Sequence, residues 1–349
     1  MTDRLTTVSL FSGCGGSDLG AHRAGATIVY ASDIRQDSIT TYTANRHLFD
    51  VDSNDVHCQD VTDITALPAA DLIIGCYPCQ SFSMGGPRRP ESDHRTKLFR
   101  EFIRCINLLN PKFIVAENVA GLAWLRGGQY LQEQTAAFQE AGAGYHISWK
   151  LLNAKDYGIP ADRRRVFIIG CRTDLGIRYD FPEPTHGDGL HQVPWVAHGP
   201  LIAHLPIEPV GDYYDYTKEP FSWWYLSRNR KRPWTAPSYA ISGNWRHLPL
   251  HPASPTMRLV SSDLEHGSRQ RWEFTKGYDD EGVQPPPPRL ESPRRLSWRE
   301  CAILQTFPSD FVPHGTVESK LWQIGNAVPP TLMEAIMRPL ITEEALSPR

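Results

Sequence analysis

The chain has 349 residues, of which 40% are hydrophobic and 21% are charged. This length suffices for one large domain or two, and the composition is ordinary for a globular protein. The first residues lack the pattern of a secretory signal, and no apolar run approaches the roughly 18 residues of a membrane span. Seven scattered cysteines favour reduced thiols, so we expect a cytoplasmic protein. With a net charge of −3, a nucleic-acid partner would need a local basic surface.

Apolar strands alternate with amphipathic helices through the first half of the chain. Ser17 is suited to begin the first helix and Gly25 to end it, and Pro111 ends the third helix. This alternation predicts an α/β fold with a doubly wound, mostly parallel sheet. The expected strands cover residues 5–11, 26–32, 71–75, 112–118, 145–152 and 165–170, and the expected helices cover residues 17–25, 38–45, 97–110 and 131–142.

The character of the sequence changes after Cys171. Residues 181–295 are rich in Pro, Trp, Arg and Tyr, include a run of four prolines, and have no sustained helical period. Helical periodicity returns at 297–307 and again near 331–337. We therefore expect one domain built from residues 1–180 and 316–349, and a smaller irregular domain with its hinge at residues 181–315.

A glycine-rich segment, FSGCGG at residues 11–16, joins the first strand to the first helix. Closely spaced glycines let a ligand approach the backbone, and the helix N-terminus offers free N–H groups. Asp33 follows the next strand, where a carboxylate can bind ribose hydroxyls. Because position 18 is Asp, the segment is not a dinucleotide fingerprint, and another adenosine ligand fits better. An ordinary tight turn explains the segment about equally well.

The segment GCYPCQSFS, residues 75–83, follows a buried strand and contains a C-x-x-C pair. A structural zinc site is disfavoured because no second pair of ligands stands at a suitable spacing, and we expect no metal. A thiol redox pair is a fairer alternative. In a third interpretation Cys79 is a lone nucleophile restrained by Pro78, and Cys76 only packs. The segment alone does not decide between the last two.

Two further groups of polar residues lie at strand ends. Glu117 ends a buried strand, at the edge where open α/β sheets bind ligands. Arg163 and Arg165 begin a later strand, and alternation directs both to the same face. Taken singly, a cap or salt bridge explains Glu117, and a solvated surface explains the arginines.

Taken together and in this order, these segments resemble the DNA cytosine-5 methyltransferase family, in its bacterial restriction–modification form. FSGCGG resembles the family's cofactor motif, PCQSFS its catalytic motif, ENV its glutamate motif and YGIPADRRRVFIIG its arginine-pair motif. RRLSWRECAILQTFP and QIGNAVPP resemble the two closing motifs, while QDVTDI and HRTKLF match shorter ones. The resemblance spans about residues 8–180 and 294–330. Tyr77 departs from it, since many members have proline there.

The resemblance implies a reaction on C5 of a cytosine flipped out of DNA. Cys79 would add to C6 of the base and thereby activate C5. Glu117 would face the Watson–Crick edge, which requires a carboxyl pKa raised by burial or a base protonated during attack. Arg165, together with Arg163, would hold the O2 side. A stacked base is out of reach, so the nucleotide must be extruded.

The resemblance further implies S-adenosyl-L-methionine as the methyl donor. Asp33 would bind its ribose, Ile34 would pack on adenine, and Asp60 would accept from the adenine amino group. Asn326 and Val328 would complete the pocket from the returning C-terminal segment. The remaining expected cofactor residues are Phe11, Ser12, Gly13, Cys14, Gly15, Gly16, Val61, Pro78 and Leu98.

Residues 181–293 occupy the position of the family's target-recognition region, and HPASPTM at 251–257 resembles a segment found near its end in bacterial relatives. Double-stranded DNA is the expected partner, with a restriction endonuclease as a functional counterpart and a monomer as the acting form. We expect DNA contacts from Arg88, Arg89, Arg228, Arg230, Lys231 and Arg232. Three alternatives stay open: a tRNA substrate, slightly favoured by FTKGY at 274–278; a thiol oxidoreductase; and a catalytically silent DNA-binding relative.

Overall fold

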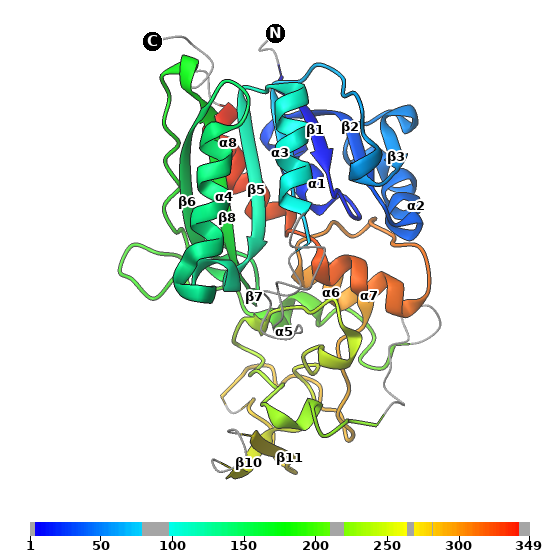
Figure 1. Cartoon of the computed structure of the whole chain (residues 1–349). Helices are drawn as coiled ribbons and strands as arrows, with labels where there is room; N and C mark the ends of the chain where they lie inside the picture. The colour runs from blue at the N-terminus through cyan, green and yellow to red at the C-terminus, as the bar shows by residue number, and fades with distance from the viewer. Residues whose placement is uncertain (1–3, 79–97, 210–219, 264–268, 281, 342–349) are drawn as a thin grey trace.

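The computed structural model describes residues 4–78, 98–209, 220–263, 269–280 and 282–341. A central sheet flanked by helices forms one part of the molecule, and an irregular region lies below it (Figure 1). Cys79, Arg88 and Arg89, which the sequence assigns to catalysis and DNA contact, lie outside the described residues. No helix within these ranges is long and apolar enough to cross a membrane.

The seven-stranded sheet confirms the expected fold class. Its order is β3-β2-β1-β4-β5-β8-β6, and every neighbouring pair is parallel except those made by β8, which is antiparallel to both β5 and β6. The strands are β1 Thr6–Leu10, β2 Thr27–Asp33, β3 Val56–Cys58, β4 Leu72–Gly75, β5 Phe113–Val119, β6 Tyr145–Asn153 and β8 Arg164–Arg172.

Helices cover both faces of this sheet, which explains the nearly continuous apolar character of the central strands. Side chains that alternate along β5 divide between two hydrophobic clusters: Phe113 and Val115 join one, and Ile114 and Ala116 join the other. The first cluster includes side chains from helices α1 Gly16–Ala24, α2 Gln36–Ala44 and α8 Pro330–Ile341. The second includes side chains from α3 Leu98–Leu109 and α4 Gln129–Glu140.

One expected helix cap is wrong in its position. The residue that precedes α1 is Gly15, with φ 88°, and Ser17 lies inside the helix with its hydroxyl donating to Asp18. A side chain at position 15 would meet the ring of Phe49 at 2.6 Å, so the turn needs glycine for both conformation and space. At the other end of α1, Gly25 has φ 113° and ends the helix as expected.

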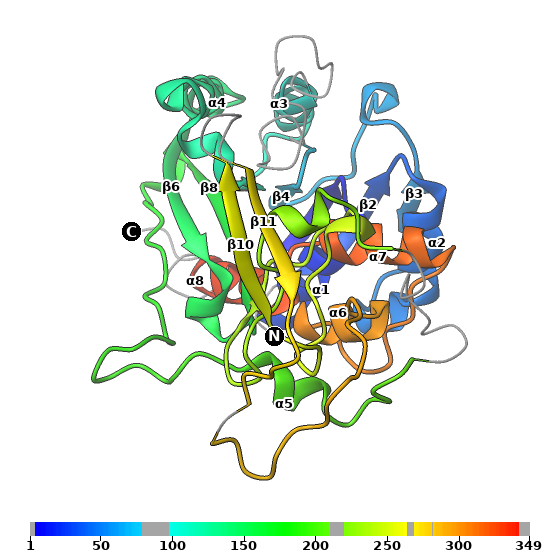
Figure 2. The ribbon, with the colours of Figure 1, turned by 90° about the horizontal axis from the view of Figure 1, so that it is seen from below.

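The irregular region has few regular elements, as its composition predicts. It contains α5 His198–Ile202, the short strand β9 Ser238–Tyr239, which pairs with β7 Ala161–Asp162, and a hairpin of β10 Met257–Asp263 and β11 Arg269–Phe274. Figure 2, seen from below, shows this hairpin extended across the face that lies under the sheet. Met257 of β10 forms a small hydrophobic cluster with Tyr225 and Leu250.

The chain then returns to the sheet through α6 Trp298–Leu304, α7 Val317–Asn326 and α8. Ser297 and Glu300 begin α6 with reciprocal side-chain-to-backbone hydrogen bonds. The domain boundary expected between residues 315 and 316 stays a prediction. Leu304 and Leu321 lie on opposite sides of this boundary, yet both belong to the hydrophobic cluster that covers one face of the sheet.

Candidate active site

The glycine-rich loop lies where β1 ends and α1 begins. Phe11 and Gly13 have φ values of 57° and 55°, and the backbone N–H of Ser12 donates to the carbonyl of Ser32 at 3.0 Å. Gly16 approaches the returning C-terminal segment so closely that a Cβ there would lie 2.4 Å from the carbonyl oxygen of Val328. The fold therefore brings two expected cofactor segments, more than 300 residues apart in the chain, into contact.

Asp33 ties this loop to the end of β2. Its Oδ2 accepts from the N–H of Gly13 at 3.0 Å, and its Oδ1 accepts from the N–H of Arg35 at 2.8 Å. Burial raises the pKa of Asp33, and the two backbone donors partly oppose that shift. The neighbouring Ile34 is 65% exposed, so its side chain is accessible to a ligand.

A short turn after β3 holds the next two expected cofactor residues. Oδ1 of Asp60 accepts from both the N–H and the hydroxyl of Thr62 at 2.9 Å, and Val61 is buried. From α3, Arg104 donates to the carbonyls of Val61 and Ile64 at 2.7 and 2.6 Å. Arg104 was not expected from the sequence, because nothing in the sequence of a helix indicates which carbonyls its arginine reaches.

Cys76 and Tyr77 continue β4 toward the segment that contains Cys79. Burial is the main reason that the pKa of the Cys76 thiol lies well above its ordinary value, and Glu117 adds to that effect. Tyr77 is buried beside Phe102, and its hydroxyl donates to Gln134 at 2.6 Å. A thiol with a raised pKa is a poor nucleophile, so these contacts agree with a packing role for Cys76. Pro78 ends the first described range, Leu98 begins the next, and both side chains are half-buried.

Glu117 and Arg165 form an ion pair across neighbouring antiparallel strands. The Nε of Arg165 lies 2.9 Å from Oε1 of Glu117, and only 7% of Glu117 is exposed. Arg165 stands opposite Val119 in the register, so the pair is diagonal. Burial raises the pKa of Glu117, although Arg165 and Arg163 oppose the shift. The carboxyl group is therefore easier to protonate than an ordinary glutamic acid.

Two buried polar atoms at this site have no hydrogen-bond partner within the part of the chain that the structure describes. They are Oε1 of Glu117, which is in contact with Arg165 but accepts no well-directed hydrogen bond, and Nε of Arg163. Leaving buried polar atoms unpaired is costly, so such atoms commonly face a ligand. The unpaired acceptor of Glu117 suits a ligand group that donates a hydrogen bond.

Arg163 is 1% exposed and donates to three backbone carbonyls. Its Nη1 reaches Ile241 and Gly325, and its Nη2 reaches Ala327. The last two flank Asn326, whose side chain is exposed and donates to the carbonyl of Trp322 at 2.8 Å. The fold thus gathers the arginine pair, Glu117 and the closing motif at one edge of the sheet.

The expected DNA-contact residues of the irregular region differ in their surroundings. Arg228 is exposed, and Arg230 is partly buried, with its guanidinium donating to the carbonyls of Tyr225 and His247 at 3.3 Å. Lys231 is buried in an ion pair with Asp279 at 2.8 Å, and Arg232 lies 3.4 Å from Asp162. Of these four residues, Arg228 presents its charge most openly to a partner.

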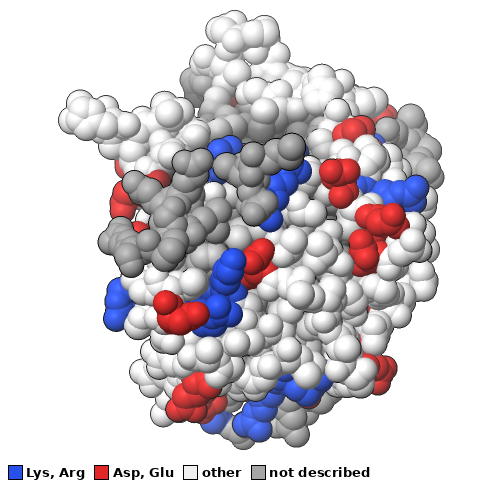
Figure 3. All heavy atoms as spheres, turned by 90° about the horizontal axis from the view of Figure 1, so that it is seen from above, with Lys and Arg blue, Asp and Glu red and all other residues white. Residues whose placement is uncertain are grey.

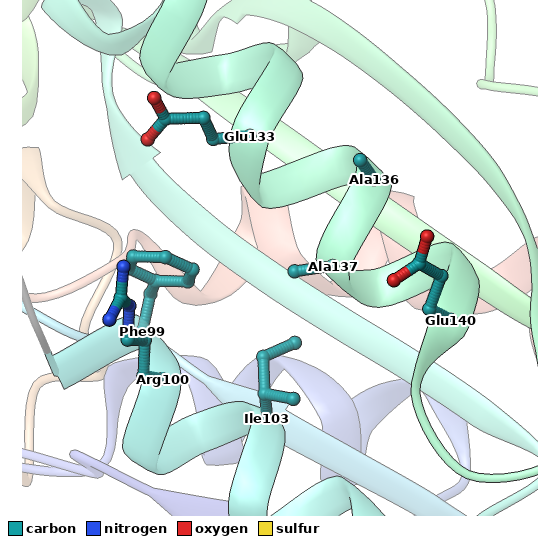
Figure 4. A pocket seen from close by; sticks show the side chains of 7 residues that line it. All are labelled: Phe99, Arg100, Ile103, Glu133, Ala136, Ala137 and Glu140. Atoms are coloured by element: carbon teal, nitrogen blue, oxygen red, sulfur yellow. The ribbon is translucent and has the colours of Figure 1, made fainter.

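Two other surfaces of the described residues differ from the site in charge and in residue content. The face opposite the irregular region carries positive and negative side chains side by side, not the single sign that favours a phosphate backbone (Figure 3). An open hollow between α3 and α4 contains none of the expected catalytic or cofactor residues (Figure 4). It is lined by Phe99, Arg100, Ile103, Glu133, Ala136, Ala137 and Glu140.

The sheet order, the glycine-rich loop and the polar residues beside it define an adenosylmethionine-type methyltransferase fold. Two solved structures share this fold at 16% sequence identity: the Entamoeba histolytica methyltransferase EhMeth, with a TM-score of 0.65 and 99% of both chains covered, and S. pombe Dnmt2, with a TM-score of 0.64 and 98% and 99% covered. At that identity, the likeness concerns the fold alone.

Sequence comparison identifies the family. The C-5 cytosine-specific DNA methylase model matches residues 5–342. The Type II methyltransferase M.BspRI of Lysinibacillus sphaericus is 33% identical, over 97% of this chain and 81% of its own length. M.BsuRI of Bacillus subtilis is 34% identical, over 97% and 80%. The chain belongs to the C-5 cytosine-specific DNA methylase family and is a DNA (cytosine-5-)-methyltransferase.

Proposed function

We propose that this enzyme methylates one cytosine within a short, specific sequence of double-stranded DNA, with S-adenosyl-L-methionine as the methyl donor. The observation that best supports it is the buried Glu117–Arg165 pair, which lies at the end of β5, on the same side of the sheet as the glycine-rich loop that follows the parallel strand β1. Relatives named Type II methyltransferases support pairing with a restriction endonuclease. We further propose that the enzyme acts as a monomer in the cytoplasm.

The donor, when bound, supplies an electrophilic methyl group. We propose that the backbone of residues 11–16 and Asp33 bind its methionine and ribose parts, while Asp60 and the exposed Ile34 bind adenine. The two backbone bonds of Asp33 support this, because they fix the carboxylate beside the loop. Asn326 and Val328 complete the pocket, which is supported by the close approach of Gly16 to Val328. The other residues in this proposal are Val61, Pro78 and Leu98.

We propose that Cys79 acts on the base, with its thiolate adding to C6 of the flipped cytosine. Glu117 holds N3 and the exocyclic amino group and supplies a proton at N3 as the thiolate adds, which its raised pKa favours. Arg165 contacts O2, and Arg163 contributes a second positive charge behind it. After methyl transfer, a base or water takes the C5 proton, the thiolate leaves C6, and the N3 proton returns to Glu117, which restores the aromatic base and the free enzyme.

The test compares Cys79→Ser with its matched control, Cys76→Ser, in transfer of a labelled methyl group to plasmid DNA. Cys79→Ser should abolish transfer because an alcohol is far less acidic than a thiol, whereas Cys76→Ser should retain most of it. Equal losses in both variants would favour a thiol pair and contradict the proposal. Bisulfite sequencing locates the product, and tRNA as a second substrate tests the RNA-directed alternative.

A further inference from the structure

Arg163 makes hydrogen bonds to backbone carbonyls that contact with a cytosine would not require. Its guanidinium donates to the carbonyls of Ile241 at 3.0 Å, Gly325 at 2.9 Å and Ala327 at 2.9 Å. Its own backbone is fixed as well, by bonds to Ala154 and Ala161. One fully buried side chain therefore joins three parts of the chain: the strand end that precedes β8, the irregular region, and the end of α7.

Two of these carbonyls flank Asn326, the residue proposed to face the methyl donor. Arg163 thus holds the peptide before Asn326, through the carbonyl of Gly325, and the peptide between Ala327 and Val328, so the backbone is fixed on both sides of Asn326. The side-chain amide of Gln305 also donates to the carbonyl of Ile324, the residue before Gly325, at 2.8 Å. The guanidinium is suited to this task because its planar fork holds several acceptors at fixed angles, which an ammonium group cannot do.

The third carbonyl, that of Ile241, belongs to residues 241–243, which pack against Gly325 and Asn326 at the end of α7. A Cβ on Gly325 would lie 2.3 Å from the backbone N of Gly243 and 2.3 Å from the carbonyl carbon of Ser242. A Cβ on Gly243 would lie 2.4 Å from Nδ2 of Asn326. The two glycines thus permit a backbone-to-backbone contact at the junction of the sheet and the irregular region, where Figure 1 shows β7, α6 and α7.

We propose that Arg163 is a positioning residue for the methyl-donor pocket: through Gly325 and Ala327 it sets Asn326, and through Ile241 it holds the turn that packs on Asn326. Contact with the cytosine then belongs to Arg165. This inference rests on the proposed function, because it takes Asn326 as a donor-binding residue.

The experiment measures S-adenosyl-L-methionine binding by calorimetry in the absence of DNA. Arg163→Lys keeps the positive charge but loses the fork, so its dissociation constant should rise about tenfold, as expected for the loss of one to two hydrogen bonds. Arg165→Lys is the matched control, and its affinity should stay within about twofold. At saturating donor and DNA, kcat should fall further in Arg165→Lys than in Arg163→Lys, because the contact with O2 of the base is proposed for Arg165.

Gly243→Ala provides a second route that leaves the arginines intact. Its added methyl group displaces Nδ2 of Asn326, so it should also weaken donor binding without DNA. If Arg163→Lys binds the donor normally but loses kcat as Arg165→Lys does, Arg163 contacts the base and the proposal is wrong. A lowered melting temperature with unchanged donor affinity in both Arg163→Lys and Gly243→Ala also overturns it. Should the unaltered enzyme itself fail to bind the donor, the proposed function fails first and this inference falls with it.

Discussion

Replacing Glu117 by Gln should separate proton transfer from base binding. A glutamine amide donates to N3 and accepts from the amino group of cytosine, as a neutral glutamic acid would, but it cannot give up a proton. A well-placed general acid contributes roughly 10²- to 10⁴-fold to a rate. We therefore expect kcat to fall at least about 100-fold while the dissociation constant for DNA changes less than about threefold. Single-turnover methyl transfer and fluorescence anisotropy measure the two quantities. A kcat within tenfold of the original enzyme would refute proton transfer by Glu117.

The same variant tests the protonation of Glu117 through stability. Because burial raises its pKa in the folded enzyme, the neutral form is favoured on folding, and stability is lost as the pH rises from the ordinary glutamic acid pKa through the raised value. Glutamine mimics the neutral form, and the loss of the opposite charge beside Arg165 offsets only part of the gain, because the net shift of the Glu117 pKa is upward. The melting temperature of Glu117→Gln should therefore exceed that of the original enzyme at pH 8, and the difference should shrink as the pH falls. A variant less stable at pH 8 would mean that the ion pair outweighs burial.

Two other predictions concern the cofactor turn and a buried ion pair. Asp60→Ala should weaken donor binding by up to roughly tenfold without altering DNA affinity, since only an adenine hydrogen bond is proposed for it; unchanged affinity in calorimetry would remove Asp60 from the pocket. Arg294→Met should cost about 3–5 kcal/mol in urea unfolding, because Arg294 donates at 2.9 and 2.7 Å to Glu300, which is 1% exposed and would keep an unpaired buried charge. A loss under about 1 kcal/mol would show that the pair is replaceable.

The sequence predicts the sheet well because its strands and helices follow local patterns. The apolar run at residues 112–118 and the glycines between the first strand and the first helix are local signals, and the expected strand and strand-to-helix junction are confirmed. The expected N-cap at Ser17 is wrong because Gly15 must turn sharply beneath Phe49, a contact made through the fold. Helix-capping preferences of neighbouring residues cannot predict a contact with Phe49, which is more than 30 residues away in the sequence.

Sequence patterns can group the site residues, but they do not give each residue its partners. Alternation predicts that Arg163 and Arg165 share a face, yet one donates to three carbonyls and the other pairs with Glu117. Those carbonyls belong to residues about 80 and 160 positions away. Every residue has a backbone carbonyl, so the amino-acid sequence does not indicate which carbonyls accept these bonds. The Ser297–Glu300 capping box, by contrast, is visible in the sequence as Ser followed three residues later by Glu.

The basic cluster at 228–232 leads to a last prediction, in which target choice resides in residues 181–293. Arg228 is exposed, whereas Lys231 is buried against Asp279, so equal charges at neighbouring positions should behave differently. Arg228→Ala should either relax the preference for one base pair, by about 1–3 kcal/mol if it reads a base, or weaken binding to all sequences with a flatter salt dependence if it holds a phosphate. Lys231→Met should instead lower stability and leave the target unchanged. Transfer of residues 181–293 from a relative of known specificity tests the whole region. If the active hybrid keeps its original target in bisulfite sequencing, recognition lies elsewhere, because the roles proposed for Glu117 and Arg165 do not involve the neighbouring bases.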